Sequence, residues 1–279
     1  MDDGQFALPK GMTAADQERL GKKLTHFAKN LARVHVVADF DRTLTDRRPG
    51  LDEDITSWNI LRDHLPEEAQ QHCRELYLAA RPKELAGTMT EHDAVDWWSG
   101  VLDTYAKHGI DMNQVEADFF ARATARDGAK PLFKLCDRLG IPTVILSAGV
   151  KEIIDLWSKH YQIYPTLTIS TELEITGGGR IAGWKRDTLV HVLNKSEVDH
   201  PELNKIRSEY PLALVFGDGI GDADMAAGDE DVLRIRIYDP RPDETTDIET
   251  ERTRTFERFD AMIESNSLRP LVELLQRMS

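Results

Sequence analysis

Short apolar runs alternate with amphipathic stretches over most of the chain. Runs of strand length lie at 34–38, 143–146, 166–170, 212–216 and 233–238, which predicts buried strands. Apolar residues spaced three or four apart predict helices at 12–31, 129–139, 151–159 and 187–194, near 222 and from 268. This alternation predicts an α/β fold with a mostly parallel sheet and right-handed crossovers.

Other segments depart from this alternation. Between 52 and 125 no strand pattern occurs, and helical stretches follow one another at 57–63, 67–80, 92–108 and 113–126. A hairpin is expected over 172–184, where three consecutive glycines make positive φ cheap, and the polar stretch 239–254 is expected to be a solvated loop or exposed helix. We therefore expect an N-terminal helical segment at 1–29 with Thr13 as N-cap, a Rossmann-like core at 30–50 and 127–279, and a helical insertion at 51–126.

The charge balance excludes several classes of partner. The 49 acidic and 35 basic residues give a formal net charge of −14, which disfavours binding to a nucleic-acid polymer or an anionic membrane. No apolar run is long enough to span a bilayer, and the start lacks the features of a secretory signal, so we expect a cytoplasmic protein. Cys73 and Cys136 lack metal-ligand spacing and are expected to be buried, reduced thiols.

Two carboxylates follow the first predicted strand of the sheet. Asp39 and Asp41 come directly after the apolar run at 34–38, and Thr43 completes an Asp-x-Asp-x-Thr pentad. Ligands bind at the carboxyl ends of strands in open α/β sheets, and two carboxylates there can act as nucleophile and proton donor. The alternative is a pair of ordinary turn or N-cap residues. We predict phosphoryl chemistry with Asp39 and Asp41 as the catalytic residues.

A second predicted strand runs into Ser147, Ala148 and Gly149. The serine hydroxyl and the backbone N–H groups of Ala148 and Gly149 can bind a phosphate at the start of the following helix. Taken alone, Ser147 fits an ordinary helix N-cap better.

A third predicted strand is followed by Asp218 and Asp222. Mg²⁺ prefers hard oxygen ligands, so Asp39, Asp218 and the backbone carbonyl of Asp41 are the expected ligands. Asp222 is expected to orient a ligand or a metal-bound water without binding the ion itself. The alternative is a calcium-like acidic turn or a helix cap. A lysine is also needed to offset phosphoryl charge, and Lys185 and Lys195 are both candidates.

These segments resemble, in order, the four motifs of the haloacid dehalogenase-like phosphatase superfamily. Within it, 147–149, 189–195 and 217–228 closely resemble the cytosolic pyrimidine 5′-nucleotidase family, also called 5′-nucleotidase III. The similarity runs from about residue 30 to the C-terminus and is thin through the insertion. The lysine of this family follows an asparagine, which matches Lys195 after Asn194 and leaves Lys185 as a secondary candidate. The resemblance implies Mg²⁺-dependent hydrolysis of a nucleoside 5′-monophosphate through an aspartyl-phosphate intermediate.

The resemblance also gives the insertion a role, because this family carries a helical cap that closes over the base. A Glu-Trp-aromatic segment of the family contacts the base and resembles Asp96-Trp97-Trp98. From the residues alone, packing is the default for both tryptophans, although neighbours on a helix point to different sides. Aspartate in place of glutamate leaves the base preference open.

Other functions remain open at this point. A phosphatase of a small metabolite such as phosphoserine would use the same core motifs, and a nucleoside phosphotransferase would pass the phosphoryl group to an acceptor alcohol. A non-catalytic nucleotide-binding protein is disfavoured because both aspartates, a lysine and the metal carboxylates are present. The expected partner is a small-molecule nucleoside monophosphate, and the oligomeric state is left open.

Overall fold

The computed structural model describes residues 7–48, 55–240 and 247–279. The expected boundary near residues 50 and 51, the start of the N-terminal segment and part of the polar stretch 239–254 lie outside the described residues.

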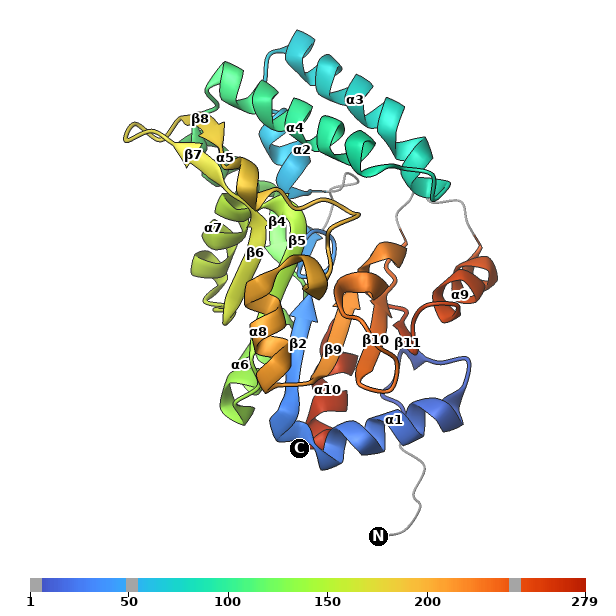
Figure 1. Ribbon diagram of the computed structural model, residues 1–279. Coiled ribbons are helices and arrows are strands. Elements are labelled where there is room, and N and C mark those ends of the chain that lie inside the picture. Colours follow the sequence, from blue (N-terminus) through green and yellow to red (C-terminus); the bar gives the residue numbers. More distant parts are fainter. Residues whose placement is uncertain (1–6, 49–54, 241–246) are drawn as a thin grey trace.

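A seven-stranded sheet forms the centre of the molecule (Figure 1). Its order is β1 (Met12–Thr13), β11 (Ala261–Ile263), β10 (Val232–Ile237), β9 (Leu212–Gly217), β2 (Val34–Ala38), β5 (Thr143–Val150) and β6 (Leu167–Thr171). Neighbouring strands are parallel except β1, which pairs antiparallel with β11. The α/β fold with a mostly parallel sheet is therefore confirmed.

Alternate residues of the central strands point to opposite faces of the sheet. Val36 and Ala38 belong to the larger apolar core, to which the helices α1 (Gln17–Lys29), α6 (Ala129–Leu139), α7 (Lys151–Tyr161) and α10 (Arg269–Met278) contribute. Val37 belongs to a second core that includes residues of α8 (Pro201–Glu209). Because both faces are covered, these strands are mostly apolar, with buried polar exceptions such as His35 of β2, and this makes them visible in the sequence.

Four consecutive helices lie between two short strands in the sequence, and we call them the inserted helices. They are α2 (Ser57–Arg62), α3 (Glu67–Leu85), α4 (Glu91–His108) and α5 (Met112–Arg122). Figure 1 shows α3 and α4 beyond the carboxyl ends of the parallel strands. Capping boxes at Thr56 and Thr90 fix the starts of α2 and α4. The flanking strands β3 (Thr45–Arg47) and β4 (Ala123–Ala125) pair antiparallel.

Several local predictions were wrong at their boundaries. Thr13 is not an N-cap, because its backbone pairs with Met262 of β11, and α1 begins later, where the Asp16 side chain accepts from Arg19 N at 2.8 Å. The helix expected at 113–126 ends at Arg122, where the chain enters β4. The helix expected near 222 is a short 3₁₀ helix at Ile220–Met225. The first two outcomes depend on strand partners far away in sequence, β11 for Thr13 and β3 for β4.

Other elements were confirmed or missed. The expected hairpin is confirmed as β7 (Leu173–Ile175) and β8 (Ile181–Trp184). Helix α8 and the short strands β1, β3, β4 and β11 were not predicted; β4 lies within 52–125, where no strand was expected. Helix α9 (Ile248–Phe256) lies within the stretch left as loop or helix. Both cysteines are free and buried, as expected. Within the described part of the chain, no helix combines the length and apolarity that a membrane crossing requires.

Candidate active site

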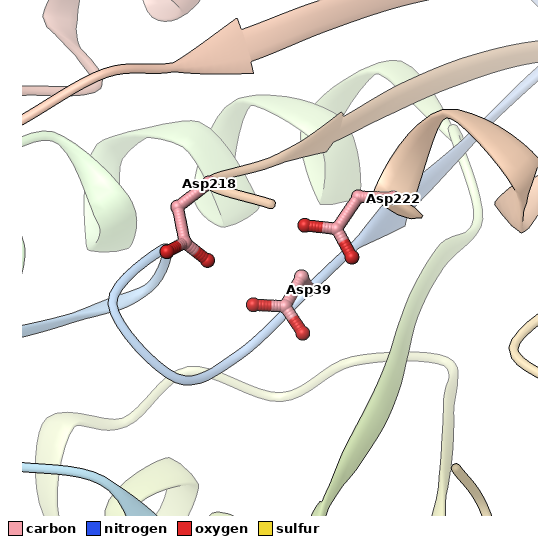
Figure 2. Close-up of side chains that lie close together, drawn as sticks. All are labelled: Asp39, Asp218 and Asp222. Atoms are coloured by element: carbon pink, nitrogen blue, oxygen red, sulfur yellow. The ribbon is translucent and has the colours of Figure 1, made fainter. Parts of the chain in front are cut away.

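Three aspartates meet at the carboxyl ends of two neighbouring strands. Asp39 directly follows β2, whereas Asp218 and Asp222 follow β9, and the three carboxylates face one another in Figure 2. Each offers an oxygen within 4.8 Å of the others. The parallel pairing of β2 with β9 brings them together, since Ala38 is in register with Phe216.

Lys195 lies within this acidic group. Its Nζ is 2.5 Å from Asp39 Oδ1 and 2.6 Å from Asp222 Oδ1, and all three side chains are buried. Burial alone would lower the pKa of Lys195, but Asp222 and Asp39 outweigh it, so the net shift of this pKa is upward. Lys195 therefore stays charged beside Asp39. Lys185, the secondary candidate, pairs instead with Glu172 and has a half-exposed side chain.

The segment before Lys195 is a loop, so the helix expected at 187–194 was wrong. The Asn194 side chain accepts from His191 N at 2.7 Å and donates to Leu189 O at 2.9 Å. The ring of His191 also accepts from Leu193 N. Side-chain hydrogen bonds of this kind compete with the backbone hydrogen bonds of a helix. Here they close the loop that places Lys195 beside Asp39.

Burial dominates the electrostatics of the carboxylates. It raises the pKa of Asp39 to about 7, with Lys195 opposing the shift, and it raises the pKa of Asp218 to about 6. Thr43 connects the two strand ends, because its hydroxyl donates to Asp39 Oδ2 and accepts from Asp218 N, both at 3.0 Å. A carboxylate cluster of this kind favours a cation that would neutralise it.

Asp41 has different partners from Asp39. Its Oδ1 accepts from Ser57 N at 2.8 Å, and its Oδ2 accepts from the Ser57 hydroxyl at 2.6 Å. Burial raises the pKa of Asp41 to about 7, although the two bonds from Ser57 favour the charged form. Ser57 is the first residue of α2 and was not identified from the sequence, because a serine beside a helix start carries no signal beyond capping.

The Ser147 turn lies next to the aspartates, but its local structure differs from the expectation. Strand β5 continues past Leu146 to Val150 with a shift in register, and α7 begins only at Lys151. Ser147 is therefore not the helix N-cap. Its buried hydroxyl accepts from Gly149 N at 3.1 Å. A Cβ atom at Gly149 would lie only 3.0 Å from Asp41 Oδ2, so this backbone approaches the acid closely.

A buried arginine supports the loop after Asp41 and was also missed. Arg126 donates to Thr43 O at 2.9 Å and to Arg42 O at 2.5 Å, and it contacts Asp239 at 3.2 Å. Arg42 has a φ of 64°, and such backbone needs support from outside the loop. A single arginine beyond the insertion gives no sequence signal for this role.

A cavity of about 490 Å³ joins the aspartates to the inserted helices. Its outer part is lined by aromatic and charged side chains, which include Trp58, Tyr77, Arg81, Glu84, Trp97, Trp98 and Tyr105. Trp97 packs against Tyr77 with ring centroids 5.8 Å apart. Asp96, expected to contact the base, is not among the described residues that line the cavity. It is 65% exposed and lies 3.3 Å from His92 Nε2. Glu84 is the carboxylate that α3 places there.

The fold recurs among solved phosphatases. Substrate-bound phosphoserine phosphatase aligns with 88% of this chain and 98% of its own, with a TM-score of 0.54 and 17% identity. A had family hydrolase from Salmonella enterica shares the fold as well, with a TM-score of 0.51 at 14% identity, covering 74% of this chain and 62% of the other. The fold is therefore one that a class of phosphatases and other hydrolases shares.

Closer similarities define the family within that class. Residues 43–278 match the pyrimidine 5′-nucleotidase (UMPH-1) family, and the chain belongs to this family of phosphoric monoester hydrolases. It is 30% identical over 215 residues to the 7-methylguanosine phosphate-specific 5′-nucleotidase of Drosophila melanogaster, covering 70% of this chain and 65% of the fly protein. The A form of that nucleotidase from Xenopus laevis is 25% identical, with 83% and 85% of the two chains covered.

A solved structure of cytosolic 5′-nucleotidase IIIB bound to cytidine shows the same fold over nearly the whole chain. The TM-score is 0.78 at 22% identity, and the alignment covers 96% of this chain and 95% of the other.

Proposed function

We propose that this protein hydrolyses nucleoside 5′-monophosphates to nucleoside and inorganic phosphate in a Mg²⁺-dependent reaction. The main support is the contrast between two carboxylates that are two residues apart, Asp39 buried and Asp41 half-buried. Asp39 contacts a lysine, whereas Asp41 contacts a serine hydroxyl and a backbone N–H. Such a difference suits one carboxylate to act as an ionised nucleophile and the other to carry a proton.

The proposed reaction has two steps. Asp39 attacks phosphorus, the bond from phosphorus to the 5′-oxygen breaks, and Asp41 gives its proton to that oxygen. A water then attacks the aspartyl-phosphate and gives a proton to Asp41, while the bond from phosphorus to Asp39 breaks and the carboxylate is restored. Lys195, the Ser147 hydroxyl and the N–H groups of Ala148 and Gly149 are proposed to hold the phosphoryl oxygens.

The carboxylate cluster fits Mg²⁺, because hard oxygen donors converge there and burial raises the pKa values of Asp39 and Asp218. We propose Asp39, Asp218 and the Asp41 carbonyl as ligands. Asp222 already accepts from Lys195 and from Gly219 N, which suits it to orient these groups rather than to bind the ion. When bound, the ion would offset negative charge on the phosphoryl group.

The inserted helices are proposed to form a cap that holds the base. Trp97 and Tyr77 offer aromatic faces for stacking, and Glu84 offers a carboxylate for a polar edge or a cationic base. The related proteins are named for 7-methylguanosine phosphate and one was solved with cytidine, so we propose pyrimidine and 7-methylguanine nucleotides as the bases to test. This aromatic lining favours a nucleotide over a small metabolite such as phosphoserine. A cytosolic location is proposed from the same resemblance.

The test is a phosphate-release screen over nucleoside monophosphates, 7-methylguanosine monophosphate, phosphoserine and an aryl phosphate, with Mg²⁺ or with excess chelator. We expect release from nucleotides with Mg²⁺ only, poor support by Ca²⁺, and no release by Asp39→Asn. Preference for phosphoserine, or full activity in chelator, would contradict the proposal. Transfer of phosphate to an added nucleoside would instead identify a phosphotransferase.

A further inference from the structure

One backbone carbonyl in the Ser147 turn accepts hydrogen bonds from two indole N–H groups. Trp58 Nε1 donates to Ala148 O at 2.9 Å, and Trp98 Nε1 donates to the same oxygen at 3.1 Å. The tryptophans come from α2 and α4, and their rings are perpendicular with centroids 6.3 Å apart. Two inserted helices are thereby bonded to one peptide group of the core.

This contact fixes the direction of the next N–H group. The peptide bond between Ala148 and Gly149 is trans, so its C=O and N–H point in opposite directions. The oxygen faces the tryptophans, and the N–H of Gly149 faces the Ser147 hydroxyl at 3.1 Å. A carbonyl that accepts hydrogen bonds also polarises its peptide, which strengthens the N–H as a donor.

Trp97 has different surroundings from its neighbour Trp98. Trp98 is buried, with its N–H committed to Ala148. Trp97 is only half-buried, packs against Tyr77 and lines the cavity. Both rings line the cavity, with centroids 4.0 Å apart, but it is Trp98 whose indole N–H bonds to the Ser147 turn.

We infer that Trp58 and Trp98 are positioning residues that hold the Gly149 N–H beside the Ser147 hydroxyl, where the substrate phosphate would bind, whereas Trp97 keeps the base contact proposed above. The inference rests on the proposed function insofar as the Ser147 turn binds phosphate. Of the two adjacent tryptophans, Trp98 then acts at the phosphate end of the substrate and Trp97 at its base end. It also makes every phosphomonoester, with or without a base, depend on an indole N–H from the inserted helices.

The test uses Trp58→Phe, Trp98→Phe and the double variant, with Trp184→Phe as matched control. Trp184 also donates its indole N–H, to Asp103 Oδ1 at 2.8 Å, but it lies on β8 and not among the residues of the cavity. For each folded variant, kcat and KM are measured with cytidine monophosphate and with para-nitrophenyl phosphate, together with the inhibition constant of inorganic phosphate and the melting temperature.

Loss of either N–H should lower kcat/KM for both substrates by a similar factor, roughly five- to tenfold for one hydrogen bond, and should weaken inhibition by phosphate. The double variant should lose less than the product of the single losses, because the two donors share one acceptor. Trp184→Phe should change only the melting temperature. Trp97→Ala should lower the ratio of nucleotide to aryl phosphate turnover roughly tenfold or more.

A loss confined to the nucleotide in both Phe variants, with phosphate inhibition unchanged, would overturn the inference. Trp58 is half-buried and Trp98 is buried, so Trp58→Phe is the milder change. It still tests the inference if Trp98→Phe does not fold. Failure of the proposed function would look different. The wild type would then prefer a non-nucleotide substrate, while the Phe variants would still lower aryl phosphate turnover and phosphate binding.

Discussion

Asp41 lies against Ser57, and this contact makes the proposed acid step testable through its pH dependence. The acid must be protonated before the 5′-oxygen leaves, and burial raises the pKa of Asp41 to about 7. With saturating Mg²⁺, kcat/KM should therefore fall as the pH rises through about 7.

Ser57→Ala should move this fall to higher pH. The serine hydroxyl donates to Asp41 Oδ2 and favours the ionised carboxylate, so its removal raises the pKa of Asp41 further, by roughly one unit. The measurement is the pH profile of kcat/KM for a nucleotide. Ser99→Ala is the matched control, because the Ser99 hydroxyl donates to the Val95 carbonyl within α4 and lies outside the site. An unchanged profile in Ser57→Ala would argue that another group sets this pH dependence.

At the scale of elements, the turn after β9 requires a residue without a side chain at one position. A Cβ atom at Gly217 would lie 2.1 Å from Asp222 Oδ2 and 2.5 Å from its Cγ. Asp222 would have to move away from Lys195, to which it is bonded at 2.6 Å. The turn and the lysine loop are thus coupled through one carboxylate.

Gly217→Ala should accordingly lower kcat by roughly a hundredfold, the loss expected when a catalytic group is displaced by about 1 Å. Gly221→Ala is the control within the same turn, because a Cβ atom there meets nothing within 4 Å. Turnover of an aryl phosphate and melting temperature are measured for both variants. Comparable turnover in the two would mean that the position of Asp222 is unimportant.

At the scale of the whole molecule, the carboxylates of the site affect stability as well as chemistry. Burial raises the pKa of Asp39 and Asp41 from 3.8 to about 7, and that of Asp218 from 3.8 to about 6. The folded state then binds more protons than the unfolded state between about pH 4 and pH 7. Without metal, the contribution of these groups to stability is greatest below about pH 4 and declines as the pH rises through that range.

Mg²⁺ should reverse this loss, because it competes with protons for the same oxygens. A ligand at a hundred times its Kd stabilises the fold by about 2.7 kcal/mol, which corresponds to a rise in Tm of roughly 5–10 °C. We expect this rise at pH 8 and a much smaller one at pH 5, measured by thermal melts in chelator and in Mg²⁺. Asp218→Asn should reduce the rise at pH 8. An equal effect of Mg²⁺ at both pH values would contradict the assignment of the ion to these carboxylates.

The sequence by itself determined the elements whose two faces are both buried. The apolar runs of β2, β5 and β9 needed no partner to be recognised. Asp39 and Asp218 directly follow β2 and β9, and Ser147 lies in the last part of β5. In a parallel sheet, carboxyl ends share one edge, so Asp39, Ser147 and Asp218 could be expected there from order along the chain. The choice of Lys195 over Lys185 came from family resemblance, because local pattern does not distinguish one lysine from another.

Only the tertiary structure decided which partner each polar side chain would meet. Ser57 bonds to Asp41, Arg126 bonds to the carbonyls of Arg42 and Thr43, and Trp98 bonds to Ala148. These contacts join residues 16 to 84 positions apart, and the loop before Lys195 replaced an expected helix because the Asn194 side chain took over backbone bonds. Hydrophobic periodicity records which face of an element is buried. It does not record which polar groups come into contact once distant elements pack, and those contacts set the geometry of this site.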